Sequence, residues 1–196
     1  MLDSRIRTGW DSLMKPTGRW LAAQGVTPNM VTLFGLALQS VVAYFIVTDH
    51  LLVAGLIAIG AAFSDAFDGA VAKARGAPNR FGALLDSTVD RISDALYFLP
   101  IAWLYAFERG VAWVALASVV ALVAAFLVSY VRARAEGLGF ECKVGIAERA
   151  ERLIIGIAAL ILSPLLPIGV VTLAVLSIIT FLQRLRHVSV QAGRGS

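Results

Sequence analysis

Five carboxylates lie inside apolar stretches of the chain, where ionised side chains are rare. They are Asp65, Asp68, Asp86, Asp90 and Asp94. A carboxylate at the centre of a membrane costs about 2.5 kcal/mol or more on insertion scales, so acids in such positions usually serve a function. These residues are therefore the first candidates for chemistry in this sequence.

The spacing of four of these acids favours a metal site. Asp65 and Asp68 are three residues apart, which places both on one face of a helix. Asp86 and Asp90, four residues apart, share a face in the same way. A short basic loop joins the two helices, so we expect antiparallel neighbours whose carboxylates converge. Without a cation these groups would repel one another and take up protons, and hard oxygen ligands favour Mg²⁺, Mn²⁺ or Ca²⁺ over zinc.

Two glycines accompany the acids. Gly69 directly follows Asp68, and Gly82 precedes Asp86 by four residues. A missing side chain lets a ligand or another helix approach the backbone closely. Glycines alone are equally typical of helix packing, but beside acids at these spacings they favour a pocket for a metal ion and a phosphate.

The composition is that of a membrane protein. Hydrophobic residues make up 59% of the 196 residues and charged residues only 15%. Soluble domains contain about 45–50% apolar and about 25% charged residues. This difference argues against a soluble globular domain, a disordered chain and, despite the net charge of +4, a nucleic-acid binder.

Membrane helices must position the acids, because six stretches approach the roughly 20 apolar residues that a transmembrane helix needs. The sequence therefore predicts an all-α integral membrane protein that forms one domain over residues 1–196. The expected spans cover residues 30–48, 51–74, 81–107, 111–131, 147–163 and 165–183.

The basic residues set the expected orientation. Of the 17 Lys and Arg residues, 15 lie in the N-terminal segment, after the second and fourth spans, and in the C-terminal tail. The positive-inside rule places these segments, both termini and the acid pairs on the cytoplasmic side of the cell membrane. Residues 2–24 are expected to form an amphipathic helix at the membrane surface, or else a simple topology anchor. The single cysteine, Cys142, excludes an intramolecular disulfide.

The run from Asp65 to Lys73, followed by Gly82, Asp86 and Asp90, resembles the signature of the CDP-alcohol phosphotransferase family, D-x2-D-G-x2-A-R-x8-G-x3-D-x3-D. Every spacing is met, and one residue departs from the signature. Lys73 stands where the family has Arg, which keeps a positive charge but loses the bidentate fork. The resemblance implies that an alcohol attacks the lipid-bearing phosphate of a CDP-linked lipid and that CMP leaves.

The resemblance also implies roles for individual residues. Asp90 would be the general base. The family is also commonly dimeric, so the resemblance implies a homodimer. The segment around Pro28 has a second interpretation, a helix cap in which Thr27 is the N-cap and Pro28 the first helical residue. Two Mg²⁺ or Mn²⁺ ions would be held by Asp65, Asp68, Asp86 and Asp90. The CDP-lipid would contact Pro28, Asn29, Met30, Val31, Asp65, Asp68, Gly69, Ala72, Lys73, Asn79 and Gly82.

A basic cluster near the fourth and fifth spans points to an acceptor that carries its own phosphate. Arg149 and Arg152 lie one turn apart at a helix start, where the helix dipole disfavours cations, so a bound anion would stabilise them. The stretch resembles the actinobacterial phosphatidylinositol phosphate synthases, whose acceptor is inositol phosphate. Carried over, the acceptor phosphate would be bound by Ser129, Arg132, Arg134, Arg149, Arg152 and Arg184.

Three alternatives remain open from the sequence. Phosphatidylglycerophosphate synthases use glycerol 3-phosphate, which also carries a phosphate, so the basic cluster does not decide between the two acceptors. Intramembrane acids also mark cation transporters, although these place them near mid-bilayer. A non-catalytic family member would explain Lys73 but not the presence of all four acids.

Overall fold

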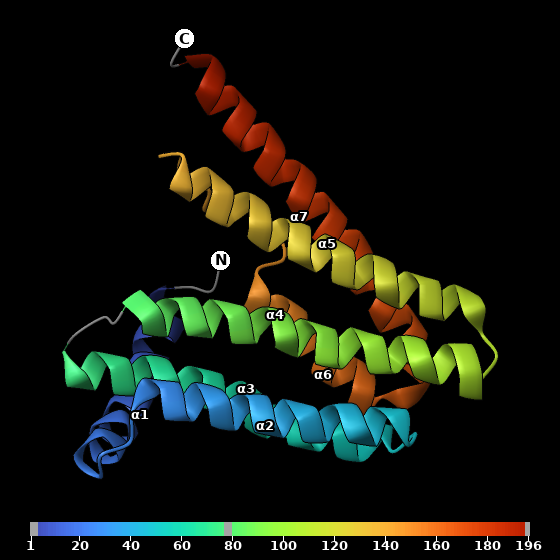
Figure 1. Ribbon diagram of the computed structural model, residues 1–196, viewed down its shortest axis with the longest axis horizontal. Coiled ribbons are helices and arrows are strands. Elements are labelled where there is room, and N and C mark those ends of the chain that lie inside the picture. The colour runs from blue at the N-terminus through green and yellow to red at the C-terminus, as the bar shows by residue number, and fades with distance from the viewer. Residues whose placement is uncertain (1–3, 77–79, 195–196) are drawn as a thin grey trace. The chain divides into compact units, whose positions relative to one another are not determined.

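The computed structural model describes residues 4–76 and 80–194, with side chains for 14–76 and 80–193. The described residues form helices and no strand, which confirms the all-α prediction. Figure 1 shows the helices in chain order. They are α1 (Ser4–Ala23), α2 (Pro28–Val47), α3 (Leu51–Arg75), α4 (Arg80–Trp103), the π-helical turn η1 (Leu104–Glu108), α5 (Ala112–Gly137), α6 (Arg149–Ile161), the 3-10 turn η2 (Ser163–Leu165) and α7 (Leu166–Arg194).

Four helices in the described part of the chain are long and apolar enough to cross a membrane. Each of the six expected stretches is helical, but two fall outside this group. Helix α6 has 13 residues and is about 20 Å long, shorter than the roughly 30 Å hydrocarbon core. Helix α4 has 24 residues, enough to cross, but it carries the charges of Asp86, Asp90, Arg91 and Asp94. The membrane character is thus supported, whereas six crossings stay a prediction. The four qualifying helices lie at Pro28–Val47, Leu51–Arg75, Ala112–Gly137 and Ser163–Gly193.

The chain divides into two compact units. The first comprises Met1–Val41 and Ile57–Ser93, and the second Val42–Leu56 and Asp94–Ser196. The first contains all four acids of the family signature. The second contains all six basic or polar residues expected to bind the acceptor phosphate.

Small residues bring helices close together in the first unit. A Cβ built on Gly18 of α1 would lie 2.8 Å from the backbone of Ala70 in α3. One built on Gly35 of α2 would lie 3.1 Å from Ser64 Oγ. The Ser64 hydroxyl donates a hydrogen bond of 2.9 Å to the Val31 carbonyl of α2. Helices α1 and α2 therefore pack tightly against the part of α3 that carries Asp65 and Asp68.

The second unit is organised around α5 and α7, which pack against each other (Figure 1). Their buried contacts include Ala121 and Leu122 of α5 with Leu173 and Ala174 of α7, joined by Phe98. Helix α6 also packs against α7. This packing fixes the frame on which the segment between α5 and α6 lies.

The expected N-terminal helix is present as α1, which contains Pro16. Side chains of residues 1–13 lie outside the described part. The location of this helix at a membrane surface therefore stays a prediction.

Candidate active site

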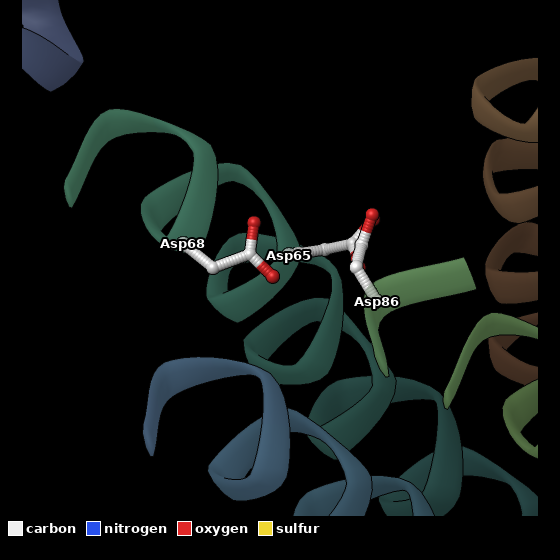
Figure 2. Close-up of side chains that lie close together, drawn as sticks. All are labelled: Asp65, Asp68 and Asp86. Carbon is white, nitrogen blue, oxygen red and sulfur yellow. The ribbon is translucent and has the colours of Figure 1, made fainter. Parts of the chain in front are cut away.

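Three of the expected metal ligands lie together. Asp65 and Asp68 come from α3 and Asp86 from α4, and one oxygen of each carboxylate lies within 4.8 Å of the others. Figure 2 shows the Asp68 carboxylate directed toward the other two. Asp68 is buried, while Asp65 and Asp86 are half-buried. The expected convergence of the two helices is confirmed for these three residues, which we call the aspartate cluster.

The aspartate cluster fits a divalent cation. Its donors are carboxylate oxygens, the hard ligands that Mg²⁺ and Mn²⁺ prefer. Three carboxylates this close, one of them buried, repel one another in a low-dielectric surrounding unless a cation or protons compensate their charge. The sequence-based prediction of a metal site is therefore consistent with the donor set and its burial.

Thr32 is a residue that sequence reasoning missed. Its hydroxyl lies 3.0 Å from Asp68 Oδ2 and 3.0 Å from the Pro28 carbonyl. The Asp68 carboxylate thus accepts a hydrogen bond from α2 in addition to any metal contact. The start of α2 also agrees with the cap interpretation, because Met30 N donates to Thr27 Oγ1 at 3.3 Å and Pro28 is the first helical residue. No local sequence pattern signalled this contact, because Thr32 and Asp68 are 36 residues apart in the chain.

Thr32→Val is expected to weaken divalent-metal activation. The substitution keeps the shape but removes the hydroxyl that orients Asp68, and loss of such an outer-shell partner typically costs about 10- to 100-fold in metal affinity or activity. The measurement is the Mn²⁺ concentration for half-maximal CMP release. Thr32→Ser keeps the hydroxyl and serves as control. Equal Mn²⁺ dependence in all three proteins would show that Thr32 does not orient a metal ligand.

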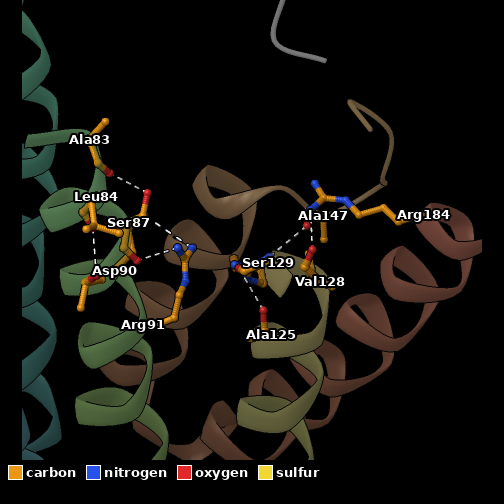
Figure 3. A network of polar contacts seen from close by, with 12 residues as sticks. Ala83, Leu84, Ser87, Asp90, Arg91, Ala125, Val128, Ser129, Ala147 and Arg184 are labelled. Carbon is orange, nitrogen blue, oxygen red and sulfur yellow. Dashed lines mark hydrogen bonds and ion pairs between the residues drawn. The ribbon is translucent and has the colours of Figure 1, made fainter. Parts of the chain in front are cut away.

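Asp90 lies one turn beyond Asp86 on α4 and outside the aspartate cluster as the described residues form it. It is half-buried, and its Oδ2 lies 3.6 Å from Arg91 Nη2. The Arg91 side chain is held by a 2.6 Å hydrogen bond to the Ser87 carbonyl (Figure 3). Asp90 therefore has a cation as close neighbour, and its expected roles as fourth ligand and base stay predictions.

The expected CDP-lipid contacts differ in their exposure. Gly69 is exposed, and a Cβ built there would meet nothing within 4 Å, so the helix leaves open space beside Asp68. Lys73 is exposed one turn further on. Met30 is 57% exposed, whereas Val31 is buried. Asn79 lies outside the described residues. The remaining expected contacts are half-buried: Pro28, Asn29, Ala72 and Gly82.

Two of the expected acceptor residues are buried arginines in the second unit. Arg184 of α7 donates from Nη1 to the Val128 carbonyl at 2.7 Å (Figure 3) and from Nε to the Val144 carbonyl at 2.9 Å. Arg152 of α6 donates from Nη1 to the Ala147 carbonyl at 3.3 Å. Backbone carbonyls thus fix both guanidinium groups.

The other expected acceptor residues are less buried. Arg149 is the first residue of α6 and is half-buried. Arg132 and Arg134 are exposed near the end of α5, and Arg132 pairs with Glu136 at 2.9 Å. The Ser129 hydroxyl bonds within its own helix, to the carbonyl four residues earlier. Buried and exposed members of this set therefore differ in how far the fold has already positioned them.

The chain is similar to known proteins in both sequence and structure. Residues 25–185 match the family described as CDP-alcohol phosphatidyltransferase. The chain is 39% identical over 182 residues to the archaetidylinositol phosphate synthase of Pyrococcus horikoshii, covering 92% of this chain and 93% of the relative. The crystal structure of Mycobacterium tuberculosis phosphatidylinositol phosphate synthase with CDP-DAG bound matches with a TM-score of 0.84 and 35% identity, covering 90% of this chain and 94% of that one. The same enzyme in complex with manganese and citrate matches with a TM-score of 0.81 and 36% identity, covering 89% and 88%.

Proposed function

Because the chain belongs to the CDP-alcohol phosphatidyltransferase family, we propose that it transfers the phosphatidyl group of CDP-diacylglycerol to inositol phosphate. The products are phosphatidylinositol phosphate and CMP. The observation that carries this proposal is the aspartate cluster, in which carboxylates of the family signature lie within 4.8 Å of one another. The relatives named for inositol phosphate lipids support the choice of acceptor over glycerol 3-phosphate, and family membership removes the grounds for a transporter.

The aspartate cluster would hold Mg²⁺ or Mn²⁺, with Asp90 as the fourth ligand and two ions in the complete site. The bound cations would neutralise charge on the diphosphate and on the leaving CMP. The relative solved with manganese supports this assignment. Thr32 would keep the Asp68 carboxylate in its ligating orientation through the 3.0 Å hydrogen bond.

Asp90 would act as general base toward the acceptor hydroxyl. The acceptor oxygen forms a bond to the lipid-bearing phosphorus, the bond from that phosphorus to the CMP oxygen breaks, and the hydroxyl proton passes to the Asp90 carboxylate. Arg91 Nη2 lies 3.6 Å from Asp90 Oδ2 and provides a positive charge beside the carboxylate that would accept this proton. Positioning and electrostatics provide most of the catalysis in such transfers.

The CDP-lipid would lie along the start of α2 and the end of α3. The open space at Gly69 admits the nucleotide diphosphate close to the helix backbone. The exposed Lys73 provides a positive charge without the fork of an arginine. The acceptor's phosphate would be bound mainly by Arg152 and Arg184, whose guanidinium groups are held in place before it arrives.

In the membrane, we propose six crossings by α2 to α7, with α1 on the surface of the lipid. The charge distribution supports placing both termini and the active site on the cytoplasmic side of the cell membrane. The protein would act as one domain over residues 1–196 and assemble as a homodimer.

An acceptor panel tests the proposed function. Purified protein is incubated with CDP-diacylglycerol, Mn²⁺ and one of inositol phosphate, glycerol 3-phosphate, inositol or glycerol, and CMP release is measured. We expect release with inositol phosphate and little with the unphosphorylated alcohols, because these lack the group that the buried arginines bind. Release only with glycerol 3-phosphate would establish the alternative acceptor, and no release with any compound would reject the enzyme activity.

A further inference from the structure

The segment of residues 138–148, between α5 and α6, has no helix or strand. Such connections usually leave their backbone groups to solvent. Here side chains of one helix, α7, bind the backbone of the segment at several points. We call it the docked segment.

Gln191 makes the contact nearest the C-terminal end of α7. Its Nε2 donates to the Glu141 carbonyl at 2.7 Å, and its Oε1 accepts from Glu141 N at 3.1 Å. One side-chain amide therefore satisfies both backbone groups of one residue. This two-point contact fixes the position of Glu141 as well as its orientation.

Three further α7 side chains continue the contact toward α6. Gln183 Oε1 accepts from Ile146 N at 3.1 Å, and Thr180 Oγ1 accepts from Ala147 N at 3.2 Å. Arg184 Nε donates to the Val144 carbonyl at 2.9 Å. Helical spacing places these α7 residues along one face of the helix. The docked segment thus follows α7 for more than two turns of that helix.

Close packing accompanies the hydrogen bonds. Cys142 is fully buried in the docked segment. Gly145 has a φ of +144°, and a Cβ built there would lie 2.5 Å from Thr180 Cγ2. A side chain at position 145 would therefore push the segment away from α7. Polar and apolar contacts together require the observed conformation.

The docked segment provides the carbonyls that hold two arginines. Val144 accepts from Arg184 and Ala147 accepts from Arg152, so displacement of the segment would remove one backbone partner from each guanidinium group, while Arg184 would keep its bond to the Val128 carbonyl of α5. We propose that Gln183 and Gln191 are positioning residues for the phosphate of the acceptor. They keep the docked segment on α7 and thereby keep Arg152 and Arg184 in position to bind this phosphate. This inference rests on the proposed function, because the acceptor's phosphate is there assigned to Arg152 and Arg184.

The single cysteine of the chain reports docking directly. Cys142 is the only thiol, so its rate of labelling by a maleimide measures release of the segment in the full-length protein. Gln191→Ala removes two hydrogen bonds and is expected to raise this rate by about tenfold or more. Gln191→Glu keeps an acceptor for Glu141 N but places a carboxylate oxygen, a second acceptor, opposite the Glu141 carbonyl. The two acceptors repel, so this variant should also raise the rate of Cys142 labelling. Ser189→Ala is the matched control and should label like the wild type, because the Ser189 hydroxyl donates to the Arg186 carbonyl of the same helix.

Kinetics test the positioning role. Gln191→Ala should raise the KM for inositol phosphate about tenfold while kcat and the KM for CDP-diacylglycerol change less than about threefold. Gln183→Ala should act in the same way and provides a second test if Gln191→Ala fails to fold. Unchanged labelling in both variants would overturn docking by these residues. Faster labelling with an unchanged acceptor KM would overturn the positioning role. If the wild type releases no CMP with any acceptor, the proposed function and the acceptor role both fall, while the labelling comparison still decides docking.

Discussion

Asp68→Asn is expected to reduce CMP release by on the order of 10²- to 10³-fold, the scale seen when one preorganised electrostatic group is removed from an active site. The asparagine keeps the size of the side chain but removes the negative charge. Asp68 is the buried member of the aspartate cluster and the one that Thr32 orients. Its loss therefore removes a ligand that the fold has already placed, and CDP-diacylglycerol binding in the presence of Mn²⁺ should weaken as well.

A matched control is available in the same chain. Asp49→Asn makes the same chemical change at a surface turn, where Asp49 pairs with Arg109 at 2.5 Å and has a φ of +58°. Asparagine tolerates this left-handed conformation, so the backbone of the turn should persist. Its activity should stay within about threefold of the wild type, because exposed ion pairs contribute little to stability. If Asp68→Asn kept a tenth or more of the wild-type activity, the aspartate cluster would not be the metal centre.

The aspartate cluster was predictable because its information is local. Spacings of three and four residues place each pair on one helix face, and a short connection makes the two helices neighbours. Thr32 was not predictable in this way, since it lies 36 residues before Asp68 in the chain. Its contact depends on the close approach of α2 to α3, which the small residues Gly35 and Ser64 permit. A lone threonine in an apolar helix gives no sign of its partner.

The limits of helix counting have a similar physical cause. Apolar stretches locate helices well, and all six expected ones exist. Length is less well determined, because the stretch expected over 147–163 gives only the 13 residues of α6. Its first two residues, Ala147 and Glu148, belong to the docked segment, whose backbone is bound by α7 side chains. Hydrogen bonds between the side chains of Gln183 and Gln191 and the backbone leave no pattern in the sequence, since any residue other than proline offers the same backbone groups.

Asp90→Asn is expected to stop CMP release while leaving CDP-diacylglycerol binding largely intact. The reason is its position: it lies outside the aspartate cluster, one turn along α4, with Arg91 as close neighbour. An amide cannot take the proton of the acceptor hydroxyl, and removal of a general base typically costs about 10²- to 10⁴-fold in rate. The measurements are kcat for CMP release and the Kd for CDP-diacylglycerol in the presence of Mn²⁺.

Comparing Asp90→Asn with Asp68→Asn separates the two roles. If Asp90 acts chiefly as the base, the two variants lose activity alike but differ in lipid affinity, because Asp90→Asn leaves all three carboxylates of the aspartate cluster in place. Asp90→Glu keeps a carboxylate and should recover part of the rate with the same lipid Kd. If Asp90→Asn weakened CDP-diacylglycerol binding as strongly as Asp68→Asn, Asp90 would act chiefly as a metal ligand. Full activity in Asp90→Asn would exclude both roles and would require the acceptor proton to leave by another group.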